Sequence, residues 1–143
     1  MKKFLKFGLL FIVLTVALTG CGNGAAKLNK TVDIESDSIK ITVLGSEQVT
    51  VDDSEFSSVN GEYIKVKLSI ENYGNETYGW STLDFKLGDE IASFGAVVLP
   101  DLIKIEIASG ETETGYIYFP VTDSDELTYT ATNLTDKATF KIK

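Results

Sequence analysis

Carboxylates are the most plentiful reactive side chains in this sequence of 143 residues. The chain holds 21 aspartates and glutamates but no histidine, which excludes Ser–His–Asp and Cys–His nucleophilic arrangements. A pair of carboxylates could still cleave a glycosidic bond by acid and nucleophilic catalysis. The candidates lie beside expected strands or in turns: Asp84, Glu106, Glu111 and Glu113. Such positions usually form a solvated acidic surface, so we expect that the chain is not an enzyme.

Metal ligands are scarce. A zinc or copper site would need imidazole or sulfur ligands, and the chain has one cysteine and one methionine. Calcium could bind either of two acidic runs, at residues 52–55 and 123–126. Neither run follows the twelve-residue calcium loop with its central glycine. We therefore predict solvated turns at both places, with no metal and no cofactor.

Three aromatic residues, Tyr73, Tyr78 and Trp80, surround one expected turn and are candidates for partner contact. Trp80 shares its strand parity with Asp84, on the outward side, which would expose it for stacking on a sugar or a peptide. The alternative, which we favour, is a bulge at residues 81–82 that turns Trp80 into the core. Large aromatic side chains are buried far more often than they bind a partner.

The only cysteine, Cys21, follows Leu18, Thr19 and Gly20. Leu18-Thr19-Gly20-Cys21 resembles the lipobox of bacterial lipoproteins. The resemblance implies that a diacylglyceryl group is attached to the Cys21 sulfur and that the peptide is cut just before it. Two acyl chains suffice for a stable membrane anchor, since each buried methylene contributes ~0.8 kcal/mol. The alternative is a free or buried thiol, which the position of Cys21 disfavours.

The residues before Cys21 have the pattern of an export signal. Lys2, Lys3 and Lys6 precede an uncharged apolar run at residues 7–18. A membrane-spanning helix would need ~20 predominantly apolar residues, so the short run favours a signal peptide. Export and the lipid would place the protein on the outer face of the cell membrane. The absence of arginine suggests a Gram-positive source.

The chain therefore divides into a signal peptide (1–20), a flexible tether (21–36) and one domain (37–143). Loss of the three signal lysines would change the net charge from −8 to −11. So acidic a chain is a poor partner for nucleic acid, which is a polyanion. Within the tether, a first edge strand around Val32 and Ile34 is the alternative.

Beyond the tether, apolar residues recur at every second position, as they do in half-buried strands. The alternating runs are 39–43, 64–70, 83–87, 103–107, 116–119, 127–129 and 140–142. Glycine, asparagine and aspartate turns separate them. We therefore predict an all-β, two-sheet sandwich. The apolar connection at 91–99 departs from this alternation, so it is either a buried crossing strand or an interface.

A family resemblance supports this fold. Residues 61–143 resemble a bacterial domain of unknown function that is found mostly in lipoproteins and is catalogued as telomeric repeat-binding factor 2. The resemblance rests on the motifs Asn72-Tyr73-Gly74, Phe85-Lys86-Leu87-Gly88-Asp89 and Gly115-Tyr116-Ile117-Tyr118-Phe119-Pro120. The family is similar to a secreted mycobacterial immunoprotective antigen. This likeness implies an immunoglobulin-like sandwich and supplies no catalytic or ligand residues.

Together these features predict a lipid-anchored, exported binding module that catalyses nothing. Its partners would be the membrane, through Cys21, and a cell-surface protein or glycan. One alternative is a surface hydrolase that uses carboxylates. The other is a structural accessory subunit of an envelope complex, with residues 94–99 as its contact patch.

Overall fold

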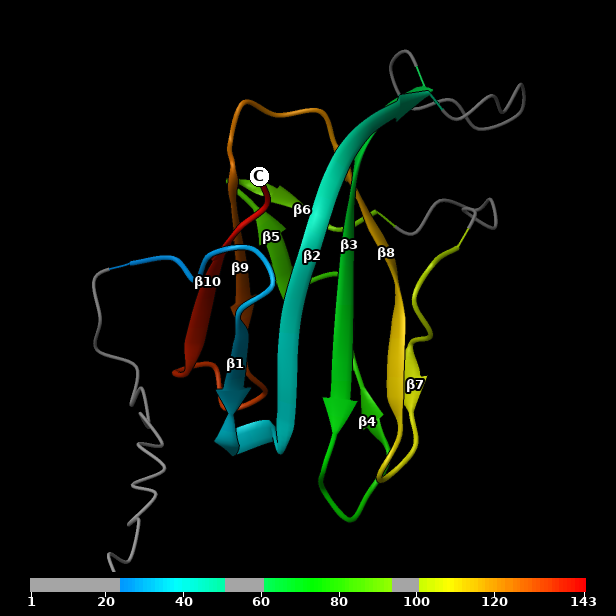
Figure 1. Cartoon of the computed structure of the whole chain (residues 1–143), viewed down its shortest axis with the longest axis vertical. Coiled ribbons are helices and arrows are strands. Elements are labelled where there is room, and N and C mark those ends of the chain that lie inside the picture. Colours follow the sequence, from blue (N-terminus) through cyan, green and yellow to red (C-terminus); the bar gives the residue numbers. More distant parts are fainter. Residues whose placement is uncertain (1–23, 51–60, 94–100) are drawn as a thin grey trace, which may run out of the picture.

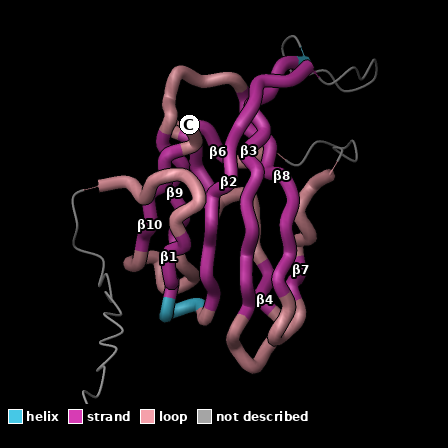
Figure 2. Tube along the Cα trace, viewed as in Figure 1, coloured by secondary structure: helices cyan, strands magenta, loops and turns pink. Residues whose placement is uncertain are grey.

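The computed structural model describes residues 24–50, 61–93 and 101–143 (Figure 1). Almost all regular structure is strand, with one short 3-10 helix (Figure 2). The elements are β1 (Thr31–Ile34), η1 (Glu35–Asp37), β2 (Ile39–Thr50), β3 (Glu62–Asn72), β4 (Tyr78–Gly79), β5 (Phe85–Leu87), β6 (Glu90–Ile91), β7 (Glu106–Ile107), β8 (Thr112–Pro120), β9 (Glu126–Thr130) and β10 (Lys137–Lys141).

Two four-stranded sheets pack face to face (Figure 1). The first has the order β1-β2-β3-β8, the second β10-β9-β5-β6, and β4 pairs with β7 in a two-stranded ribbon. Every pairing between these strands is antiparallel. The predicted all-β sandwich is therefore confirmed.

The core lies between the sheets because the alternation turns one apolar side of each strand inward. Among its fully buried members are Ile39, Ile41, Val43, Val66, Leu68, Ile70, Phe85, Leu87, Ile117, Phe119, Leu127, Tyr129 and Phe140. A bulge between Val43 and Gly45 interrupts the pairing of β2 with β3.

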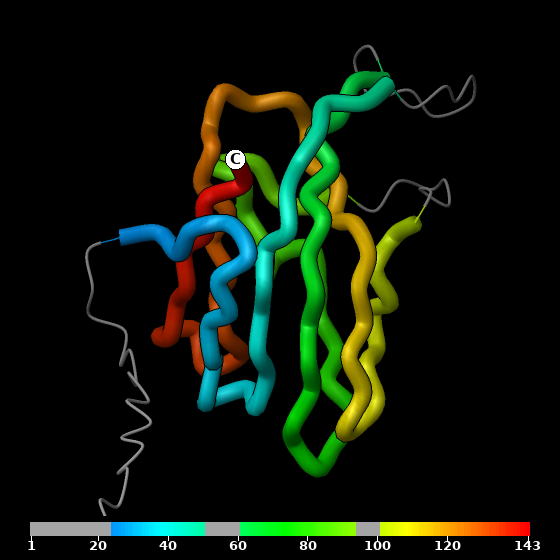
Figure 3. Tube along the Cα trace, viewed as in Figure 1, coloured from blue at the N-terminus to red at the C-terminus, as the bar shows by residue number. Residues whose placement is uncertain are grey.

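The folded body begins earlier than the predicted boundary at residue 37. Val32 and Ile34 belong to edge strand β1, so the alternative within the tether is correct. Ala26 bridges to Phe140, which sets the first described residues beside the last strand (Figure 3). The predicted flexible tether over 21–36 is therefore wrong for the part from Ala26 onward.

Two predicted strands are shorter than the alternation suggested. Leu83 is 68% exposed because residues 81–84 form a turn, in which Asp84 N–H donates to the carbonyl of Ser81. Ile105 is 46% exposed although Ile103 and Ile107 are buried, since only Glu106–Ile107 pair as a strand, with β4.

The apolar connection after β6 is described only up to Ser93. Ala92 is buried, and Ser93 N–H donates to the carbonyl of Tyr118, so this part runs along the edge of β8. The proposed crossing strand and contact patch at 94–99 lie outside the described residues, as does the predicted signal peptide. Within the described part, no helix is long and apolar enough to cross a membrane.

Candidate functional site

The structure separates the three aromatic residues of the predicted contact group. Tyr73 is exposed, and its hydroxyl donates to Asp33 at 2.7 Å. Partial burial and this hydrogen bond raise the pKa of Tyr73 to about 12. Lys40 lies over the Tyr73 ring, 5.4 Å from its centroid. Tyr73 is thus the one member of the group that a partner could reach.

Tyr78 is buried and belongs to a polar network between the sheets. Its hydroxyl donates to that of Tyr129 at 2.9 Å, because the Tyr129 hydroxyl donates in turn to Asp37. Asp37 also accepts hydrogen bonds from the backbone and the hydroxyl of Thr132. Burial is the main cause of the raised pKa of both tyrosines. The network ties η1 to the β9–β10 turn and leaves Tyr78 unavailable to a partner.

Trp80 is 3% exposed and packs edge-on against Phe85. Its indole N–H donates to the carbonyl of Lys104 at 2.8 Å. The favoured interpretation, burial, is correct, but the device is the turn at residues 81–84 and not a bulge. The aromatic contact group predicted from the sequence is therefore wrong for Tyr78 and Trp80.

Two of the four candidate carboxylates, Asp84 and Glu113, are engaged in local contacts. Glu113 accepts from Lys104 at 2.8 Å, and Asp84 caps its own turn by accepting from the Ser81 N–H at 2.7 Å. In the acidic run at 123–126, Lys141 lies 3.3 Å from Asp125 and 3.0 Å from Glu126. Its ammonium group thus pairs with two of the carboxylates of this run. No group of three metal-ligating residues occurs in the described ranges; the run at 52–55 lies outside them.

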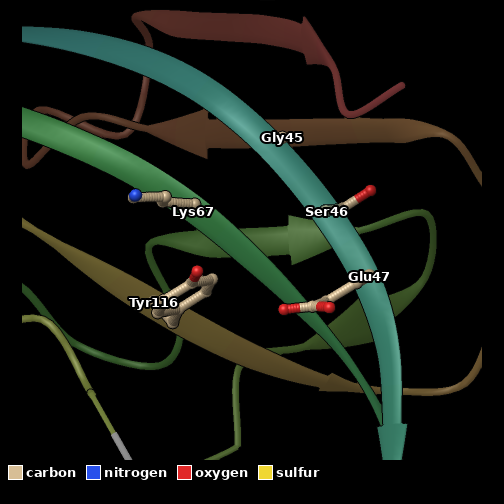
Figure 4. A pocket seen from close by; sticks show the side chains of 5 residues that line it. All are labelled: Gly45, Ser46, Glu47, Lys67 and Tyr116. Atoms are coloured by element: carbon tan, nitrogen blue, oxygen red, sulfur yellow. The ribbon is translucent and has the colours of Figure 1, made fainter.

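The described surface is hollowed on the outer face of the first sheet (Figure 4). This hollow, which we call the Tyr116 hollow, has a volume of about 190 Å³ and is lined by Gly45, Ser46, Glu47, Lys67 and Tyr116. Gly45 lies directly opposite Lys67 at the bulge, and Lys67 lies opposite Tyr116 on β8. An added Cβ at Gly45 would meet nothing within 4 Å, so the glycine keeps the hollow open.

Glu47, Lys67 and Tyr116 reach the hollow from three neighbouring strands, whereas Ser46 points away from them (Figure 4). The Ser46 hydroxyl donates inward, to the carbonyl of Ile142 at 2.8 Å. The polar groups available to a ligand are thus a carboxylate, an ammonium group and a phenol.

Lys65 fixes the position of the Tyr116 ring. Its ammonium group lies 4.3 Å from the ring centroid and 2.9 Å from a carboxylate oxygen of Glu47. The hydrogen bond to Glu47 raises the pKa of Lys65, against a smaller opposing effect of burial. Lys67 lies farther from the ring, at 6.0 Å, and pairs with no carboxylate in the described part of the chain. Lys65 is therefore a positioning group, and Lys67 is the cation that remains for a ligand.

A second apolar cluster continues this face toward the other end of β3. Tyr63 and Tyr118 are buried there with rings in edge-to-face contact, and Val49, Leu102 and Tyr116 pack against them. Tyr116 therefore lies between the ammonium group of Lys65 and this apolar cluster, and both hold its ring in place.

The alternation of β8 already indicates that Tyr116 and Tyr118 face away from Ile117 and Phe119. The sequence does not show which residues of β2 and β3 meet them, because that depends on strand register. The Tyr116 hollow was therefore missed, although its tyrosine was visible in the pattern.

The domain of unknown function DUF4352 matches residues 26–139 of the chain. The chain belongs to this family. The match confirms the predicted resemblance to a domain of unknown function, and its start at residue 26 agrees with the earlier beginning of the sheet body. No curated protein sequence matches the chain.

Solved structures share the fold at low sequence identity. The secreted protein MPT63 from Mycobacterium tuberculosis has a TM-score of 0.59 at 14% identity, over 84% of this chain and 99% of that one. The YjhA protein from Bacillus subtilis has a TM-score of 0.59 at 15% identity, over 82% and 99%. YcdA, a candidate lipoprotein from Bacillus subtilis, has a TM-score of 0.55 at 22% identity, over 79% and 38%. The expected likeness to a secreted mycobacterial sandwich protein is confirmed at the level of fold.

Proposed function

We propose that the protein is a lipid-anchored, exported binding module without catalytic activity, and that its contact surface includes the Tyr116 hollow. The observation that carries the binding part of the proposal is the open space at Gly45. Lys67 and Tyr116 bring an ammonium group and a phenol to this space, and Lys67 is not paired with a carboxylate of the described residues. Small-molecule and partner sites typically combine such a concave surface with a few convergent polar groups.

Export and anchoring are supported by the sequence and by two similar folds. The lipobox-like quartet ending at Cys21 favours a diacylglyceryl anchor. One structural relative is a secreted protein and another is a candidate lipoprotein. The partner in this proposal is a protein or glycan at the cell surface, and the net charge of −8 argues against nucleic acid.

The absence of catalysis is supported by the contacts of the carboxylates. The rival, a surface hydrolase, needs two carboxylates about 5–9.5 Å apart across a cleft. Glu47, the carboxylate at the hollow, is bound to Lys65 at 2.9 Å. The described lining of the hollow holds no second carboxylate that could complete the pair this chemistry needs.

Fractionation of cells that express the full chain tests the anchoring. The wild-type chain should be found in the membrane fraction and be accessible to protease on intact cells. Cys21→Ser or globomycin should disturb processing and release. A soluble intracellular chain that keeps its N-terminal methionine would refute the proposal.

Site-specific photo-crosslinking on intact cells tests the contact surface. The photoreactive residue replaces Lys67 in one variant and Lys86, an exposed lysine of β5 in the other sheet, in the control. We expect adducts at position 67 and few at position 86. Equal yields at both positions would mean that the outer face of the first sheet is not a preferred contact surface.

A further inference from the structure

Four small hydroxyl side chains form a straight row across the outer face of the first sheet. The register places Thr31 opposite Thr42, Thr42 opposite Ser69, and Ser69 opposite Thr114. The row, which we call the hydroxyl row, therefore crosses all four strands and spans about 14 Å at ordinary strand spacing. No described segment passes in front of β2 and β3 on this face (Figure 1).

These hydroxyls face solvent and are only partly used. Thr31 and Thr114 are exposed, Thr42 and Ser69 are half-buried, and the neighbours of Thr42 and Ser69 along each strand are buried. Thr31 and Thr42 share one hydrogen bond, at 2.7 Å. Ser69 and Thr114 make no side-chain hydrogen bond with any described residue. The row thus offers groups that can both donate and accept.

The Tyr116 hollow adjoins this row. Lys67 lies two residues from Ser69 on β3, and Tyr116 lies two residues from Thr114 on β8. Each step is about 7 Å along the strand. Gly45 takes the corresponding place on β2 and leaves the space open. A ligand on the hydroxyl row would therefore also reach a phenol and an ammonium group.

The face is electrically balanced, although the whole chain carries a net charge of −8. The acidic and basic residues of this face are Asp33, Lys40, Glu47, Lys65, Lys67 and Glu71, three of each sign. Asp33 and Glu71 both lie opposite Lys40, and Glu47 pairs with Lys65. An uncharged ligand therefore suits this face, because neither sign dominates it.

The residue types also distinguish a glycan from a protein. A protein interface usually centres on aromatic or aliphatic anchors. Of the large apolar side chains that the described part exposes, Tyr73 lies at the edge of this face, beside Asp33 and Lys40, and none lies in the hydroxyl row itself. Serine and threonine lose little side-chain entropy on binding, and each hydroxyl matches a sugar hydroxyl as donor and acceptor.

We infer that the hydroxyl row and the Tyr116 hollow together bind an uncharged polysaccharide of pyranose rings. The inference rests on the proposed function and names the ligand class of the same face. The chain of rings lies along the row, with one ring in the hollow within hydrogen-bond reach of Tyr116 and Lys67. Such a ligand could be a glucan or an uncharged N-acetylated amino-sugar polymer outside the cell.

Affinity electrophoresis of the full chain, in a detergent without a sugar headgroup, tests this inference. The first gel contains hydroxyethylcellulose, a soluble glucan. The second contains glycol chitin, an uncharged polymer of N-acetylglucosamine, and the third contains polygalacturonate as an anionic polymer. We expect retardation in the first or second gel and none in the third. The gel that retards the chain identifies which of the two kinds of sugar is bound.

Variants that remove hydroxyls without changing side-chain shape make the test specific to the row. Thr42→Val with Thr114→Val should weaken retardation by about tenfold, as expected for two lost hydrogen bonds. The matched control is Thr128→Val with Thr139→Val, an opposed pair on the outer face of the second sheet, which should behave as wild type. Thermal unfolding followed by Trp80 fluorescence shows that each variant is folded.

Absence of retardation in the first two gels, retardation by polygalacturonate alone, or equal loss in both double variants would overturn the inference. These outcomes are separable from failure of the proposed function. A protein adduct at position 67 without retardation by polysaccharide would refute the glycan and leave the binding module. An unexported chain that is still retarded would refute the anchored module and leave the glycan.

Discussion

Asn72 is the buried polar residue on which the lower end of the sandwich depends. It is 1% exposed, and its side-chain amide donates to the carbonyls of Glu76 at 2.8 Å and Ile107 at 2.9 Å. Its side-chain oxygen accepts from the Gly74 N–H at 3.0 Å. One side chain therefore ties the turn after β3 to the end of β7.

Replacement of Asn72 by alanine should remove all three hydrogen bonds and leave buried partners unsatisfied. At about 1 kcal/mol net per bond, the free energy of unfolding should fall by about 3 kcal/mol. This loss is a large part of the free energy of unfolding of a typical domain, which is about 5–15 kcal/mol. For a urea slope of about 1.5 kcal/mol/M, the unfolding midpoint should move down by about 2 M.

Asn133 provides a matched control, because its side chain also makes three hydrogen bonds. It donates to Asp136 and accepts from the N–H groups of Thr135 and Asp136, but the turn is exposed. Water can replace these partners in Asn133→Ala, so the loss should stay below about 1 kcal/mol. The number of bonds is the same in both variants, and only burial differs.

Urea unfolding followed by the emission of Trp80, the only tryptophan, measures both variants. Its indole is buried, so unfolding should shift the emission to longer wavelength. Equal midpoints for Asn72→Ala and Asn133→Ala would refute the reasoning, since burial would then not decide the cost. An unchanged midpoint for Asn72→Ala would show that its three hydrogen bonds contribute nothing.

Two further predictions concern packing and pH. Gly115→Ala should destabilise the fold by about 1–3 kcal/mol, because the added Cβ would lie 2.7 Å from the Cα of Ile103 and overpacking forces the backbone to move. The control is Gly24→Ala, which has open space around it and should cost nothing measurable in the same urea assay. Equal costs for the two variants would contradict the close approach at Gly115. Unfolded tyrosines ionise near pH ~10, whereas Tyr78 and Tyr129 have raised pKa values and keep their protons in the fold. The unfolded state then binds fewer protons, so the free energy of unfolding should fall as pH rises above ~10, more steeply in wild type than in Tyr129→Phe. Urea midpoints on both sides of that pH and tyrosinate absorbance measure this, and parallel pH profiles would contradict it.

The part of the site that the sequence predicted is the part that depends on strand parity. Alternation in β8 places Tyr116 outward and Ile117 inward, since successive side chains of a strand point to opposite faces. The same rule predicts a buried Leu83 and an exposed Trp80, whereas Leu83 is exposed and Trp80 is buried. The rule fails there because the turn at 81–84 interrupts the alternation of the strand. A turn of this kind carries no strong glycine or proline signal here, so periodicity alone could not reveal it.

The amino-acid sequence by itself determined that this protein is a β-sandwich with one apolar side on each strand, and that its cysteine follows an export-like segment. Local spacing suffices for these properties, because side-chain direction along a strand repeats every two residues. Only the tertiary structure decided that Thr42, Ser69 and Thr114 form one row beside the Tyr116 hollow. Register between strands distant in sequence is set by the bulge at Gly45 and by packing of the whole core, which no local pattern encodes.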